Sequence, residues 1–120
     1  MGKVIRFPET HIGPERRRRL EGVITERSWE ALIPFPRMRQ AIREVIVERH
    51  AQIARWGDQD HVDPHEWLAI LTEEVGEVAK PVADARVKDF RLQEYREELV
   101  QVAAVAVAAI EAIDSQQEVK

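Results

Sequence analysis

The chain has no cysteine, so disulfide bonds and thiolate metal sites are excluded, while its redox compartment stays undecided. It also lacks any apolar run near the roughly 20 residues that a bilayer span requires. Its first residues lack the long apolar region of a signal peptide. From these absences we expect a cytoplasmic protein without membrane contacts.

An excess of positive charge is absent as well, because the formal net charge is −4. Surfaces that bind nucleic acid are normally basic, so we do not expect a nucleic-acid partner. The run Arg16-Arg17-Arg18-Arg19 is a local exception. Such charge runs are usually solvated faces, and contact with nucleic acid or an acidic partner is the alternative.

Length and proline positions suggest the domain organisation. A chain of 120 residues, 44% of them hydrophobic, is long enough for one compact core. Residues 1–35 form a charged leader interrupted by prolines, with room for a short helix between Pro14 and Pro34. We expect residues 36–115 to form the helical domain and residues 116–120 a tail.

Three helices are predicted in that domain, which makes the fold class all-α. Apolar residues recur at spacings of three, four and seven from Pro36 to Trp56, and Gly57 is a suitable helix end. Asp63-Pro64 has the form of an N-cap followed by a first-turn proline, so a second helix should begin there. The third helix is predicted from about residue 90 to residue 113.

Three glutamates interrupt the apolar pattern of the second helix. On a helical wheel of about 100° per residue, the narrowest apolar arc of the second helix is predicted to be its core stripe. Glu74 and Glu77 fall within a second apolar strip, whereas Glu73 lies at the edge of the polar face. Like charges one turn apart between packed helices repel each other unless a cation, such as Mg²⁺, neutralises them. The alternative is that they are ordinary surface acids. The predicted core stripe consists of Leu68, Leu71, Val75, Val78 and Val82. Beyond the acids, Pro81 predicts a kink or an end of the helix.

The third helix offers a matching set of oxygen ligands. Glu94, Glu98, Gln101 and Val105 share one strip, so antiparallel packing of the two helices would bring Glu98 and Gln101 toward the acids of the second helix. The strip contains no histidine, which favours Mg²⁺ or Mn²⁺ over Zn²⁺. From residue 99 to residue 110 this helix is apolar on nearly all sides, so we expect self-association to cover it.

These residues together resemble a known signature. The pattern Glu73-Glu74-x-x-Glu77, followed about twenty residues later by Glu98-x-x-Gln101, resembles the EExxE and ExxD motifs of the all-α nucleoside triphosphate pyrophosphohydrolases, in particular the small MazG-like proteins. The resemblance covers about residues 38 to 113. It also includes Trp56-Gly57, Trp67-Leu68-Ala69-Ile70-Leu71 and the Ala- and Val-rich segment that follows Tyr95.

The resemblance implies a helical bundle completed as a homodimer or homotetramer. It implies a hydrolase that cleaves a nucleoside triphosphate or deoxynucleoside triphosphate to the monophosphate and pyrophosphate with Mg²⁺, or alternatively Mn²⁺. By position, the metal ligands would be Glu74, Glu77, Glu98 and Gln101, and Glu73 would orient or deprotonate the attacking water. The candidate substrate-binding residues are Trp56, Lys80, Lys88, Arg91 and Arg96. Trp56 would stack on the base, although a core or interface position is the alternative, and the cations would hold the pyrophosphate.

Two positions depart from the pattern. Gln101 stands where the family has an aspartate, and a neutral amide supplies an oxygen without a charge. Pro81 interrupts a helix that normally continues. Activity could therefore be lower, altered in selectivity or absent. The alternative function is a non-catalytic helical module that dimerises or binds a partner.

Overall fold

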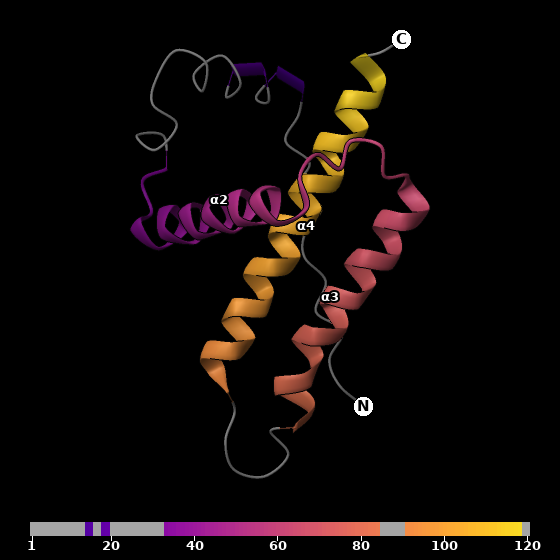
Figure 1. The fold of residues 1–120 in the computed structure, drawn as a ribbon. Helices are drawn as coiled ribbons and strands as arrows, with labels where there is room; N and C mark the ends of the chain where they lie inside the picture. Colours follow the sequence, from indigo (N-terminus) through magenta and orange to yellow (C-terminus); the bar gives the residue numbers. More distant parts are fainter. Residues whose placement is uncertain (1–13, 16–17, 20–32, 85–90, 119–120) are drawn as a thin grey trace. The chain divides into compact units, whose positions relative to one another are not determined.

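A computed structural model describes residues 14–15, 18–19, 33–84 and 91–118 of the chain. Its main elements are three helices, α2 (Pro36–Trp56), α3 (Pro64–Asp84) and α4 (Leu92–Glu118), shown in Figure 1. The residues so described contain no strand, which confirms the all-α prediction. Most of the predicted leader helix, including Arg16 and Arg17, lies outside them.

The chain divides into two units, Met1–Arg39 and Gln40–Lys120. The boundary falls in the first turn of α2. The packing of α3 against α4 lies within the second unit. Within the described parts of the chain, no helix is both long and apolar enough to cross a bilayer.

Local signals set the helix ends that the sequence predicted. Gly57 has φ of 68°, a backbone conformation that glycine adopts without a Cβ clash, and its N–H donates to the carbonyl of Ile53 at 2.8 Å. At the start of α3, Asp63 Oδ1 accepts hydrogen bonds from the N–H groups of His65 (2.8 Å) and Glu66 (3.0 Å). The predicted end of α2 and the N-cap of α3 are both confirmed.

Pro81 does not itself end α3, so of the two predicted effects a kink stays a prediction, and α4 is longer than predicted. α3 continues past Pro81 to Asp84, because a proline in the last turn leaves only the carbonyl of Glu77 without its helical partner. α4 extends five residues beyond the predicted Ile113, into the segment expected to be a tail. Gln116 explains part of this extension, since its Nε2 donates to the carbonyls of Asp60 (3.0 Å) and Val62 (3.2 Å).

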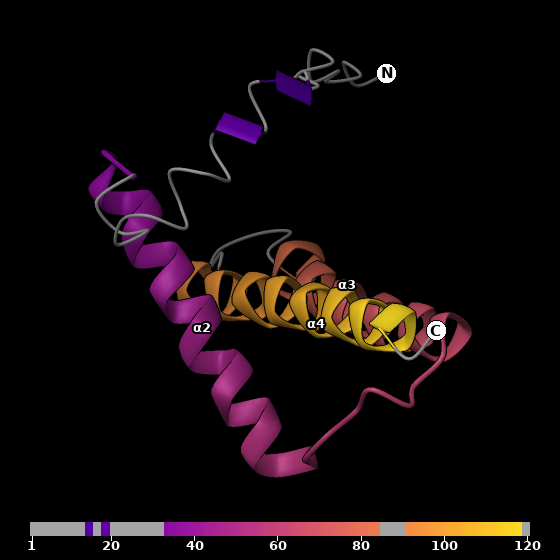
Figure 2. The same cartoon turned by 90° about the horizontal axis from the view of Figure 1, so that it is seen from above.

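α3 and α4 form an antiparallel pair, lying side by side in both views (Figures 1 and 2). Trp67 of α3 is the large buried side chain of this pair, and it belongs to a cluster with small or β-branched residues of α4. Alanines on the α4 side permit close approach of the two backbones. The buried cluster consists of Val62, Trp67, Val105, Ala108 and Ala112, with Ile70, Leu71 and Ala109 packed against it.

The predicted core stripe of α3 was wrong for three of its five residues, whereas Leu71 packs against the buried cluster and Val78 is half-buried. Leu68, Val75 and Val82 are 64%, 51% and 50% exposed. The face that packs against α4 is the second strip, which contains Trp67 and Ile70, because burying the indole removes the most apolar surface from water. Glu74 lies on that same strip and is half-buried, whereas Glu73 is exposed.

α2 reaches the pair through ion pairs. Arg49 Nε lies 2.6 Å from Glu111 Oε2, and Arg96 donates to the carboxylate of Glu44. Figure 2 shows α2 running across α4 rather than along it. This crossing places the Glu44 side of α2 beside the N-terminal half of α4.

Candidate functional site

Glu74 is the half-buried carboxylate at the centre of the candidate site. Burial raises the pKa of Glu74, and the negative charges of Glu98, Glu73, Glu77 and Glu48 raise this pKa further. Both causes disfavour the ionised form. The residue expected to bind a cation therefore lies in a negative field that comes from three helices.

Glu98 lies opposite on α4 and is also half-buried. Burial raises the pKa of Glu98, as do the charges of Glu77, Glu94 and Glu97, while Lys80 lowers it. Thus α3 and α4 each present a carboxylate that feels the charge of the other helix. The charge of Glu98 acts on Glu74, and that of Glu77 acts on both Glu74 and Glu98, but their convergence on one ion stays a prediction.

The donor set fits a hard divalent cation in its chemistry, since it offers carboxylate oxygens whose mutual repulsion a cation would relieve. The ammonium group of Lys80 relieves part of this repulsion, since its Nζ lies 2.9 Å from Glu77 Oε1 and 3.1 Å from Glu77 Oε2. Across the described segments, no three His, Asp or Glu side chains are grouped so that they could hold a metal ion as they stand. An ion would require the glutamate side chains to turn toward one another.

Gln101 borders a small polar cavity of about 220 Å³ between α2 and α4. The cavity also adjoins Glu48 and Glu44 of α2 and Arg96 of α4. Reasoning from the sequence missed Glu48, although it shares one face of α2 with Glu44. No pattern within α2 distinguishes this acid from a solvated one.

The described candidate cations all contact acids. Arg91 Nη1 lies 2.8 Å from Glu94 Oε2. Arg96 donates to Glu44, and this hydrogen bond lowers the pKa of the Glu44 carboxyl. Lys88 lies outside the described residues.

Two further candidates lie toward solvent. Trp56 is 53% exposed at the end of α2, with the Arg55 guanidinium 5.0 Å from its ring centroid. This exposure excludes a core position, and both base stacking and an interface position stay predictions. Glu73 is exposed at the edge of α3, next to Glu74.

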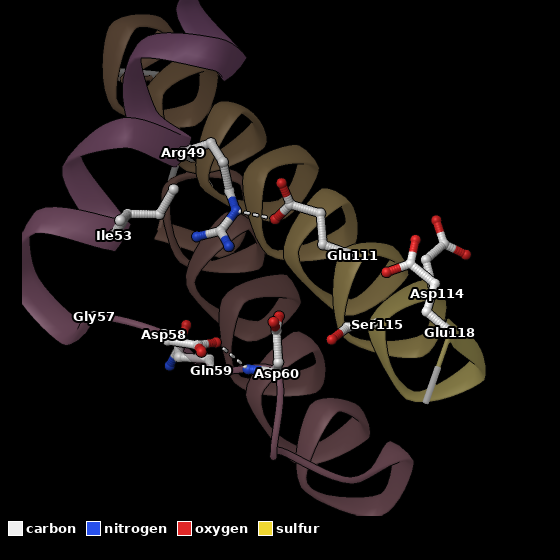
Figure 3. Close-up of a pocket in the computed structure, with 10 residues that line it drawn as sticks. All are labelled: Arg49, Ile53, Gly57, Asp58, Gln59, Asp60, Glu111, Asp114, Ser115 and Glu118. Carbon is white, nitrogen blue, oxygen red and sulfur yellow. Dashed lines mark hydrogen bonds and ion pairs between the residues drawn. The ribbon is translucent and has the colours of Figure 1, made fainter. Parts of the chain in front are cut away.

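A second acidic region was not predicted, and Figure 3 shows it around a hollow of about 430 Å³. Asp58 and Asp60 of the α2–α3 loop and Glu111 of α4 border it, and Arg49 reaches in from α2. Arg49 neutralises Glu111, and Asp58 Oδ1 accepts the N–H of Asp60 at 2.8 Å. These groups are engaged in holding the loop and the helices.

No protein-family model, curated protein or solved structure matches this chain.

Proposed function

We propose that the chain is a metal-dependent nucleoside triphosphate pyrophosphohydrolase of the MazG-like type. The observation that supports this best is that Glu74 on α3 and Glu98 on α4 are half-buried and each feels the charge of acids on the other helix, so that burial and like charge raise the pKa of both. Packed helices rarely keep repelling acids on their contact faces without a role for them. The motif resemblance supplies the reaction class.

Each residue has a separate task in this proposal. Glu74, Glu77 and Glu98 hold Mg²⁺ or Mn²⁺, and Gln101 offers an amide oxygen beside them. When bound, the ion neutralises charge on the triphosphate oxygens. Glu73, exposed beside Glu74, accepts the proton of the attacking water or orients it toward the α-phosphorus.

Lys80 has two alternative partners in this scheme. Its ammonium contacts Glu77 in the free protein. In the proposed reaction Lys80 turns from Glu77 toward the leaving pyrophosphate, whose developing charge it stabilises. Trp56 stacks on the base, and Arg91 and Arg96 add positive charge if they leave their acidic partners.

Self-association is part of the proposal. The exposed stripe Leu68, Val75 and Val82 on α3, together with exposed Ile110 on α4, leaves apolar surface that a second copy of the chain would cover. A homodimer or a homotetramer would complete the helical bundle.

The test is a panel of nucleoside and deoxynucleoside triphosphates with Mg²⁺ or Mn²⁺, assayed for released pyrophosphate. Turnover of at least one nucleotide is expected, and Glu74→Gln should abolish it while circular dichroism stays unchanged. Glu66→Gln, an exposed acid in the first turn of α3, is the matched control and should keep activity. Turnover that survives Glu74→Gln would contradict the assigned site.

One observation favours the alternative, a non-catalytic module that dimerises or binds a partner. An apolar groove of about 530 Å³ lies between α2 and α4, lined by residues such as Ile46, Ile53 and Val107, and these three are exposed. The module predicts no turnover on any nucleotide and no stabilisation by Mg²⁺ or Mn²⁺. Thermal melts with and without metal separate the two functions.

A further inference from the structure

One long face of α3, which we call the outer face, is exposed and carries no charge. On a helical wheel of about 100° per residue, its eight residues share an arc of about 140°. All eight are exposed, and the three largest, Leu68, Val75 and Val82, are 64%, 51% and 50% exposed. An uncharged, largely apolar surface of this length indicates a contact surface. The outer face consists of Leu68, Ala69, Thr72, Val75, Gly76, Ala79, Val82 and Ala83.

The outer face points away from α4. Trp67 and Ile70, which pack in the α3–α4 pair, lie on the opposite side of the helical wheel, and Glu74 and Glu77 also lie outside the arc. An added Cβ at Gly76 would meet no atom of the described residues within 4 Å, so the middle of the face is open. A partner on the outer face would therefore leave the α4 contact and the candidate metal ligands in place.

The residues of the outer face form rows that are symmetric about its middle. Large side chains recur every seven residues around Val75, and small ones recur in step around Gly76. A seven-residue spacing is the repeat of helices that pack along one another. If a second α3 is turned end for end, each row meets the same row of the other helix, as a two-fold axis requires. The large row is Leu68, Val75 and Val82, and the small row is Ala69, Gly76 and Ala83.

The two edges of the outer face favour this antiparallel direction. Glu73 and Lys80 form one edge, seven residues apart and of opposite charge. In an antiparallel pair Glu73 lies across from Lys80 of the second copy, so the charges attract. The other edge, with Leu71 and Val78, meets the same apolar edge of the second copy. A parallel pair would instead place the charged edge against the apolar one, at a cost in desolvation.

We propose that a second copy of the chain covers the outer face, with its α3 antiparallel and the two-fold axis near Val75 and Gly76. This inference rests on the self-association included in the proposed function, and it adds the face, the partner helix and the direction. Small residues in the middle of the face let the two backbones approach closely, and the large row then packs against itself.

The first test is sedimentation equilibrium of the full chain, and the wild type should be a dimer or a larger assembly. Val75→Lys places two ammonium groups beside the two-fold axis, and it should raise the dissociation constant at least about 100-fold. Val47→Lys is the matched control, because Val47 is 68% exposed on α2, and it should associate as the wild type does. Circular dichroism melts verify that each variant folds.

Cysteine cross-linking tests the direction, and the absence of natural cysteine makes each introduced thiol unique. Val75→Cys should form a disulfide between two copies, because this position lies beside the same position of the second copy. Leu68→Cys and Val82→Cys should form a disulfide when the two variants are mixed before oxidation, and neither should cross-link with itself.

A monomeric wild type, or a folded Val75→Lys variant that associates as the wild type does, would overturn the interface. Cross-linking of Leu68→Cys with itself would overturn the antiparallel direction. An associated wild type that hydrolyses no nucleotide would leave the interface standing and contradict the proposed hydrolysis. Turnover by a monomeric wild type would do the opposite.

Discussion

Replacing Glu74 by glutamine should stabilise the metal-free protein. The substitution keeps the shape of the side chain and removes its negative charge. That charge is repelled by four others, those of Glu98, Glu73, Glu77 and Glu48. A repelling pair on a helical surface costs about 0.2–0.5 kcal/mol. Since Glu74 is only half-buried and solvent screens its charge, we expect a total gain of about 1 kcal/mol at neutral pH.

The assay is thermal unfolding by circular dichroism in EDTA. A gain of about 1 kcal/mol should raise the Tm of a chain of this length by roughly 3–5 °C. With Mg²⁺ the wild type should instead have the higher Tm. An ion at ten times its Kd stabilises the protein that binds it by about 1.4 kcal/mol, and the variant lacks one of the carboxylates proposed to bind the ion. Glu66→Gln is the control, and it should be slightly destabilising because acids in the first turn interact favourably with the helix dipole.

The pH dependence gives an independent check. When the pKa of a carboxyl is higher in the folded than in the unfolded chain, its protonated form stabilises the folded protein. This stabilisation is fully present below the unfolded pKa of about 4, and it is lost as pH rises through the folded pKa. Glu74 and Glu98 both have raised pKa values, whereas that of Glu44 is lowered and acts in the opposite direction. The advantage of Glu74→Gln should therefore be present at pH 7 and vanish near pH 4. A variant less stable than the wild type at pH 7, or an advantage independent of pH, would refute the reasoning.

Three further substitutions test the helix ends and the core. Asp63→Ala removes the acceptor of two N-cap hydrogen bonds, and it should cost about 1 kcal/mol, seen as a lower Tm. Gly57→Ala meets no atom within 4 Å of its new Cβ, so only the positive φ opposes it, and the urea midpoint should fall by the equivalent of about 1 kcal/mol. Trp67→Ala removes the largest side chain of the α3–α4 core, and it should lower the free energy of unfolding in urea by about 3–5 kcal/mol. Leu68→Ala, at an exposed position of the same helix, should lower it far less.

The sequence was most informative where the physical cause is local. The end of α2 depends on the φ of one glycine, and the start of α3 depends on an aspartate that accepts two N–H groups within three residues. Such interactions need no tertiary contact, so they are readable from neighbouring residues alone. The extension of α4 past Ile113 could not be predicted in this way, because Gln116 donates to carbonyls of a loop more than fifty residues earlier in the chain.

The choice of the packing face of α3 shows where periodicity stops being sufficient. A helical wheel yields two apolar strips on α3, and the narrower one, with Leu68 and Val75, looked like the core. The strip with Trp67 is the buried one, because one indole removes more surface from water than an aliphatic side chain does. That choice bears on the proposed site, since the Trp67 strip also carries Glu74, which feels the charge of Glu98 on α4. The buried Trp67 and the half-buried Glu74 lie on one face of α3, so the protein keeps a carboxylate whose ionised form is disfavoured where an apolar side chain would be more stable.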